Sequence, residues 1–170
     1  SRITVPLSST LIVDPLTALA PFVPNLPAQL SAWAARDPDR PCIAERAGKG
    51  GPWIEYSFGQ FKHAADAVAQ WLINQRLRTG RSLLILSGNS IAHAVVKFGG
   101  MASGVPVCPV SANYSLMPGD FGRLRHVVKL VKPAVVFAEQ TGLFKRALET
   151  VDFGDAVVVT ADPSALTRPA

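Results

Sequence analysis

Residues 82–110 have the sequence SLLILSGNSIAHAVVKFGGMASGVPVCPV. The first part, SLLILS, is largely apolar and has the length of a buried strand. Apolar residues then recur at the spacing of an α-helix from Ile91 to Ala102, and a second apolar run, VPVCPV, follows Gly104. A strand, a helix and a strand in this order indicate a βαβ unit with parallel strands. We therefore expect an α/β fold.

The glycines of this stretch, Gly99, Gly100 and Gly104, suggest either a phosphate-binding loop or a structural role. Phosphate loops lie between a strand and the start of a helix, where backbone amides are free. Gly99 and Gly100 fall inside the helical pattern, where they permit close packing against the sheet. Gly104 suits a left-handed C-terminal cap. We interpret all three glycines as structural.

The alternation of strands and helices continues towards the C-terminus. A polar turn, SANYS, leads to a helix around Leu124 and then to the strand AVVFAE. A short helix from Gly142 to Glu149 and a last strand, AVVVTA, follow. The prediction is a mainly parallel, doubly wound sheet with helices on both faces. The core positions expected are Leu83, Ile85, Val107, Val135 and Val158 on strands, and Phe61, Leu72, Phe98 and Leu124 packed on the sheet from helices.

The chain before this sheet divides into two parts. Residues 1–25 contain several prolines and no regular period, so we expect an extended arm lying along a surface that covers Leu11, Ile12, Val13 and Phe22. From Leu26 the pattern is helical until DPDRP, and CIAER and WIEYS indicate a hairpin. Ser57 and Gln60 form a capping-box pattern before a long helix. The predicted organisation is an arm over 1–25 and an α/β subdomain over 26–170.

Composition argues against several classes of function. The net charge of +5 is spread along the chain without a run of five cations or interleaved aromatic residues, which argues against nucleic-acid binding. No apolar run is long enough to cross a bilayer, and we expect no membrane partner. Cys42 and Cys108 lack CxxC spacing and indicate free thiols in a cytoplasmic protein. The histidines have no metal-ligand spacing.

Small polar segments follow the predicted parallel strands, at the edge where open sheets bind ligands. They are SGNS at 87–90, SANYS at 111–115, AEQTG at 138–142 and TADPS at 160–164. These residue types suit a binding edge, and they equally suit helix caps. Lys145 and Arg146 would either reach an anionic ligand at this edge or form a solvated helix face. Residue patterns alone leave both alternatives open.

Several segments, taken in order, resemble the acyl-adenylate-forming synthetases, which include acyl-CoA synthetases, luciferases and peptide-synthetase adenylation domains. The segments are LSAWAARDPDRPCIAER, WIEYSFGQFKHAADAVAQWL, LLILSGNSIAHAVVKFGGMASGVPVCPVSANYSL and FGRLRHVVKLVKPAVVFAE. They look like the start of the family's large N-terminal domain. The combination of WAARDPDR…AER with SGNS…GVPVCPVSANYSLM is especially similar to feruloyl-CoA synthetases.

The resemblance implies that the full-length protein is an ATP-dependent acyl-CoA ligase. In this family ATP and a carboxylate form an acyl-adenylate, Mg²⁺ offsets the phosphate charge, and coenzyme A displaces AMP to form a thioester. The family's phosphate loop, ribose aspartate and C-terminal lysine have no counterpart here, so the chain resembles an N-terminal fragment that is inactive alone. The implied partners are a small aromatic or acyl carboxylate, the remainder of the N-terminal domain and a C-terminal domain. A homodimer is a further expectation.

Carried over by position, the resemblance implies a coenzyme A site made of Ser111, Asn113 and Tyr114 after one strand, with Lys145 and Arg146 after the next. Tyr114 would stack on adenine, and the cations would pair with phosphate. No catalytic residue and no metal ligand is assigned to this chain. The competing hypotheses are a freestanding doubly wound module that binds a nucleotide or coenzyme A without catalysis, and a structural domain left by degradation of a larger gene.

Overall fold

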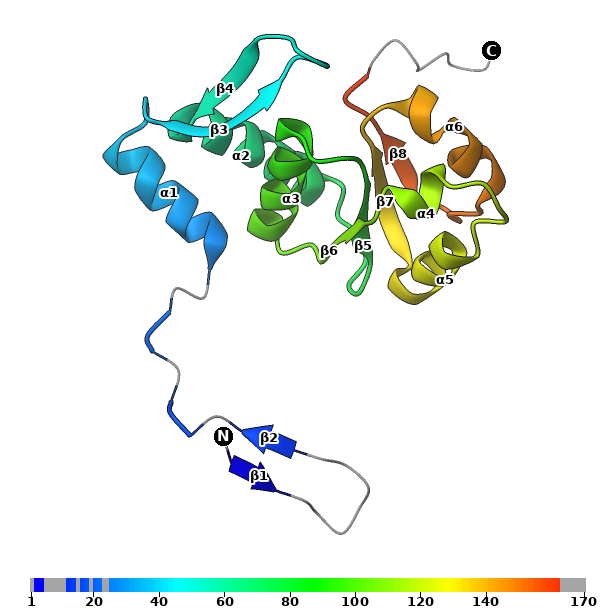
Figure 1. Cartoon of the computed structure of the whole chain (residues 1–170), viewed down its shortest axis with the longest axis horizontal. Helices are drawn as coiled ribbons and strands as arrows, with labels where there is room; N and C mark the ends of the chain where they lie inside the picture. The colour runs from blue at the N-terminus through cyan, green and yellow to red at the C-terminus, as the bar shows by residue number, and fades with distance from the viewer. Residues whose placement is uncertain (1, 5–11, 15, 19, 23–24, 163–170) are drawn as a thin grey trace.

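A parallel sheet lies at the centre of the computed structural model, which describes residues 2–4, 12–14, 16–18, 20–22 and 25–162 (Figure 1). Its strand order is β6-β5-β7-β8. The strands span Ser82–Leu86 (β5), Val107–Val110 (β6), Pro133–Ala138 (β7) and Val157–Val159 (β8). Every residue of β5 is buried, because this strand is internal and both of its faces are covered. The predicted parallel sheet is confirmed.

Helices cover both faces of the sheet, as predicted (Figure 1). α2 (Phe58–Asn74) and α3 (Ile91–Ser103) contribute to one core, and α5 (Gly122–Val131) and α6 (Thr141–Thr150) to the other. Successive strand residues point to opposite faces. The first core therefore contains Leu83, Ile85, Val135 and Phe137 with Leu72, whereas the second contains Leu84, Leu86, Val136 and Ala138 with Leu124 and Phe144.

Two adjacent glycines allow α3 to pack closely on two sides. A Cβ on Gly100 would lie 2.4 Å from Val107 Cγ2, so this residue meets the sheet as predicted. A Cβ on Gly99 would lie 2.6 Å from Val68 Cβ, so Gly99 meets α2 rather than the sheet. Gly104 ends the helix at φ +76°, which confirms the left-handed cap.

A third cluster lies beside the sheet. It contains Leu30 of α1 (Leu26–Arg36) and Phe61 of α2, and it is flanked by a hairpin of β3 (Pro41–Arg46) and β4 (Trp53–Ser57). The hairpin was predicted, as was the capping box in which Ser57 Oγ accepts from Gln60 N at 3.2 Å. Phe61 and Phe98 belong to this cluster and not to the sheet, which corrects their predicted placement. Phe98 is half-buried rather than fully buried.

Two further expectations were wrong. Val158 is 41% exposed instead of internal, because β8 is an edge strand of only three residues. The segment SANYS is not a plain turn, since a short helix, α4 (Asn113–Leu116), begins within it. The other predicted strands and helices are present within one or two residues of their expected bounds.

The predicted arm contains two short strands, β1 (Arg2–Thr4) and β2 (Ile12–Asp14), which pair antiparallel. Figure 1 shows them apart from the rest of the fold. Phe22 is 72% exposed, so the described residues do not supply the cover predicted for it, and Leu11 and the side chains of Ile12 and Val13 lie outside what the structure describes. No helix in the described part of the chain has the length and apolar character needed to span a membrane.

Candidate functional site

The polar segment after β5 serves mainly as a helix cap. Ser90 Oγ accepts a hydrogen bond from the backbone N–H of His93 at 3.0 Å, which caps α3. Ser87, which is 5% exposed, has its Oγ 2.6 Å from His93 Nδ1. The structure therefore supports capping as the role of this segment. The His93 ring has a hydrogen-bonding neighbour in the Ser87 hydroxyl.

The segments after β6 and β7 meet through α4 and α6, which lie against each other. Asn113 and Tyr114 line a cleft of about 440 Å³ together with Arg123 and the loop from Met117 to Gly122. The Arg123 guanidinium lies 5.5 Å from the centroid of the Tyr114 ring. An aromatic face and a cation are therefore adjacent at this cleft, although the cation is not one that the sequence suggested.

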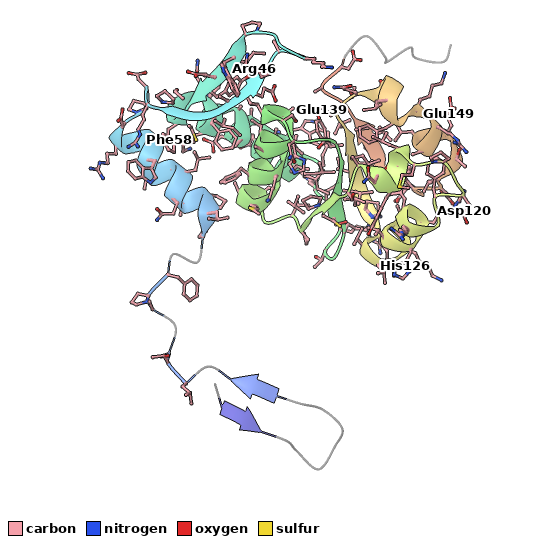
Figure 2. The ribbon with its side chains drawn as sticks, in the orientation of Figure 1. Arg46, Phe58, Asp120, His126, Glu139 and Glu149 are labelled. Atoms are coloured by element: carbon pink, nitrogen blue, oxygen red, sulfur yellow. The ribbon has the colours of Figure 1, made fainter. Side chains whose placement is uncertain are left out.

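Arg146 reaches the same region from α6. Its Nη2 donates to the Gly119 carbonyl at 3.4 Å, and its guanidinium lies 5.4 Å from the centroid of the buried Phe121 ring. Both Gly119 and Phe121 line the cleft. Arg146 is thus placed at the border of this cleft, whose lining also includes Asp120, labelled in Figure 2.

The other two residues of the predicted site, Lys145 and Ser111, do not line this cleft. Lys145 is 71% exposed, and its Nζ lies 3.8 Å from Glu149 Oε1 in the next turn of α6. Exposed pairs of this kind contribute little to stability, and neither residue lines the cleft. Ser111 is exposed before α4, and its carbonyl accepts from Tyr114 N at 2.9 Å. The structure brings Asn113, Tyr114 and Arg146 together and leaves Lys145 apart.

Two buried hydroxyl groups at this end of the sheet have no hydrogen-bond partner among the residues that the structure describes. Ser115 of α4 is 4% exposed, and neither its Oγ nor the buried Oγ1 of Thr141 in α6 is bonded to another described residue. Unbonded buried hydroxyls cost free energy, so they stand out in a fold whose other buried side-chain oxygens and nitrogens are paired among the described residues.

Sequence reasoning missed the long-range polar contacts. Arg81 Nε donates to the Lys132 carbonyl at 2.8 Å, and its guanidinium forms two hydrogen bonds to Asp155. Hydrogen bonding to Asp155 raises the pKa of Arg81 and lowers the pKa of Asp155. The contact joins the amino ends of β5, β7 and β8, and it borders a cavity of about 580 Å³ on the side away from the predicted binding edge. No local sequence motif predicts a contact between two residues that are 74 positions apart.

The two cysteines agree with the sequence interpretation. Cys42 and Cys108 are free and partly buried, and burial raises the pKa of both thiols. Within residues 25–162 and the short described ranges before them, no three His, Cys, Asp or Glu side chains form a group that could hold a metal ion.

Comparison with protein families gives one match, to the AMP-binding enzymes, over residues 30–168. The chain belongs to this family. Because the match covers most of the sequence, it confirms the resemblance to adenylate-forming enzymes, whereas a particular similarity to feruloyl-CoA synthetases has no such support. No curated protein matches the chain.

Several solved structures have a similar fold. They include a fatty acid AMP ligase from Legionella pneumophila (TM-score 0.65, 14% identity, covering 80% of this chain and 23% of that one). VinN in complex with 3-methylaspartate is 19% identical (TM-score 0.65; 81% and 34% covered). The nonribosomal peptide synthetase FmoA3, bound to AMPPNP, is also 19% identical (TM-score 0.65; 87% and 14% covered). The chain therefore spans about a third or less of these proteins.

Proposed function

We propose that this chain forms the first part of the N-terminal domain of an ATP-dependent carboxylate–CoA ligase. The observation that carries the proposal is the family match over residues 30–168, together with a fold shared by adenylate-forming enzymes. The segments that resemble feruloyl-CoA synthetases favour a small aromatic acid as the substrate. A cytoplasmic location and a homodimer remain predictions from the sequence.

The described residues do not fit ATP or Mg²⁺. They contain no group of three potential metal ligands, and the helix that holds Gly99 and Gly100 runs into a strand rather than out of one. Adenylation needs phosphate donors, a metal and a ribose anchor held together. We propose that these groups come from other parts of the enzyme and that residues 1–170 do not adenylate a substrate.

Coenzyme A fits the cleft beside α4 better, because that molecule carries an adenine ring and phosphates. The Tyr114 ring offers a stacking surface, and Arg123 and Arg146 are fixed donors for phosphate oxygens. Coenzyme A supplies the thiol that displaces AMP from the acyl-adenylate. In this proposal Ser111, Asn113 and Tyr114 position the nucleotide end, Arg146 neutralises phosphate, and Lys145 contributes only long-range charge.

An open apolar face supports the proposal that the rest of the N-terminal domain packs on this subdomain. A groove of about 370 Å³ runs over the α2 side of the sheet and is lined by Val68, Trp71, Leu83, Val135 and Phe137. Val157 of the edge strand β8 pairs with Val135 of β7 and is 50% exposed. Apolar faces of this kind are normally covered in a finished domain. We propose that a later segment of the enzyme covers it.

Calorimetric titration with coenzyme A tests the role of the cleft. We expect weak, salt-sensitive binding that Tyr114→Ala and Arg146→Ala each reduce about tenfold, because stacking and charge pairing are lost. Lys129→Ala, which removes an exposed cation from α5, is the charge-matched control and should leave binding unchanged. Equal losses in all three variants would mean nonspecific charge attraction, and would contradict a site at this cleft.

A freestanding binding module is the second candidate function, and the same cleft favours it. Coenzyme A binding alone does not separate it from the ligase. The two differ in whether a longer polypeptide containing this chain exchanges pyrophosphate into ATP, since the module would be silent in every form.

A further inference from the structure

The carboxyl ends of β5 and β7 lie side by side at the point where the strand order reverses. The chain runs from β5 to β6 on one side and then crosses to β7 on the other side of β5. In open α/β sheets ligands bind at such a point, and phosphate groups bind the helix N-terminus there. A cleft of about 410 Å³ opens at this place. Residues 88–90 and 139–140 line it together with the β3–β4 hairpin.

Glu45 of the hairpin already occupies the anion position. Its Oε2 accepts a hydrogen bond from the backbone N–H of Ile91, the first residue of α3, at 2.7 Å. The N–H of His93 is bonded to Ser90 Oγ, so a second donor of this turn is also used. A carboxylate is favourable here because the N-terminus of a helix carries a partial positive charge. The hairpin thus inserts its own anion where a phosphate would bind.

The other charged residues that line the cleft also disfavour the binding of an anion. Glu139, just after β7, is a second carboxylate in its lining, and Figure 2 shows it labelled on the same side of the sheet as Arg46. Arg46 is the cation of this lining, but its guanidinium lies 4.5 Å from the centroid of the Trp53 ring and donates to the Gly51 carbonyl. Two carboxylates thus line the cleft together with a cation that is engaged within the hairpin.

We propose that Glu45 acts as a built-in anion that excludes phosphate-bearing ligands from this cleft. Its carboxylate accepts the hydrogen bond of the Ile91 backbone N–H, so this donor is not free for a phosphate. The same carboxylate repels a second negative charge. The site of nucleotide binding common to doubly wound sheets is then closed in this chain, although the fold provides it. The inference does not rest on the proposed ligase function, and it would hold equally for a freestanding module.

Amide NMR of the 170-residue chain with added inorganic phosphate, at constant ionic strength, tests the proposal. In the unaltered chain we expect no saturable shift of the Ile91 and Ala92 amides. Glu45→Ala should bind phosphate at these amides about tenfold more tightly, because the donor is freed and the repulsion is removed. Glu55→Ala, which removes an exposed carboxylate from the same hairpin, is the charge-matched control and should behave like the unaltered chain.

Glu45→Gln keeps an acceptor for Ile91 while removing the charge, so it serves if the alanine variant does not fold. Its phosphate affinity should lie between those of the unaltered chain and Glu45→Ala. The proposal is overturned if the unaltered chain binds phosphate at Ile91 as tightly as the variants do. It is equally overturned if folded Glu45→Ala, or folded Glu45→Gln where that variant alone is available, shows no phosphate-dependent shift at these amides.

Discussion

Gly99 of α3 and Val68 of α2 are in such close contact that a Cβ on Gly99 would lie 2.6 Å from Val68 Cβ and 2.9 Å from the Ala65 carbonyl oxygen. Neither atom is the free end of a flexible side chain. The contact sets the distance between the two helices that cover one face of the sheet, and it makes the absence of a side chain at Gly99 a structural requirement.

Gly99→Ala should therefore destabilise the fold by about 1–3 kcal/mol, the usual cost of overpacking. Denaturant unfolding gives the free energy. Gly142→Ala is the matched control, since it lies in α6 with no atom within 4 Å of the added Cβ. That variant should gain about 0.5–1 kcal/mol from helix propensity. A neutral Gly99→Ala would contradict the close packing of α2 and α3.

Phe98→Ala should cost less than the substitution of a fully buried phenylalanine. Phe98 is half-buried and meets Phe61 edge-to-face at 5.2 Å between ring centroids, so we expect a loss of about 2 kcal/mol. Phe144 is 1% exposed, and Phe144→Ala should cost about 3–5 kcal/mol. The same unfolding experiment compares them. The reverse ranking would mean that the second core is not where the structure places it.

The contact between Arg81 and Asp155 should make stability depend on pH in the acid range. Because this contact lowers the pKa of Asp155 in the folded state, its contribution is complete above the ordinary carboxyl pKa and is lost as pH falls through the lowered value. Asp155→Asn should thus be less stable than the unaltered chain near neutral pH, and the difference should begin to shrink as pH falls below about 4 and vanish below the lowered pKa of Asp155. A stability difference independent of pH would show that the charge of Asp155 is not involved.

The open face beside β8 should bind an environment-sensitive dye. Val157→Lys places a charge next to the groove and should reduce dye fluorescence, because the face is no longer continuously apolar. Leu130→Lys on α5 is the control, since Leu130 is 66% exposed away from the groove. Equal reductions in both variants would mean that dye binding reports general surface hydrophobicity rather than this face.

Local patterns predicted the elements of the fold well, because each depends on residues close in sequence. The capping box at Ser57, the left-handed cap at Gly104 and the buried strand around Leu84 are all local features. The side on which a helix packs depends on distant residues, and for that reason Phe98 was assigned to the wrong neighbour. Val158 was placed inside because its strand is apolar, although being at the edge of a sheet is a property of topology.

The candidate site could be predicted only in part, for the same reason. Tyr114 and Arg146 were grouped because the resemblance to adenylate-forming synthetases carries both over by position, and the structure places Tyr114 in the lining of one cleft and Arg146 at its border. The cation closest to Tyr114 is Arg123, which lies on a helix that resembled an ordinary solvated face. The bond from Ile91 to Glu45 spans 46 residues, and no periodicity in the sequence indicates it.

Pyrophosphate exchange into ATP tests the central claim most directly. The assay compares the 170-residue chain with a longer polypeptide that includes the remaining parts of an adenylate-forming enzyme, each with Mg²⁺ and ferulate, coumarate or benzoate. We predict no exchange from the 170-residue chain, because its described residues form no group of three potential metal ligands and we propose that the phosphate donors lie in other parts of the enzyme. The longer polypeptide should exchange with at least one of these acids. Exchange by the short chain, or silence of a folded longer one with every acid, would contradict the account.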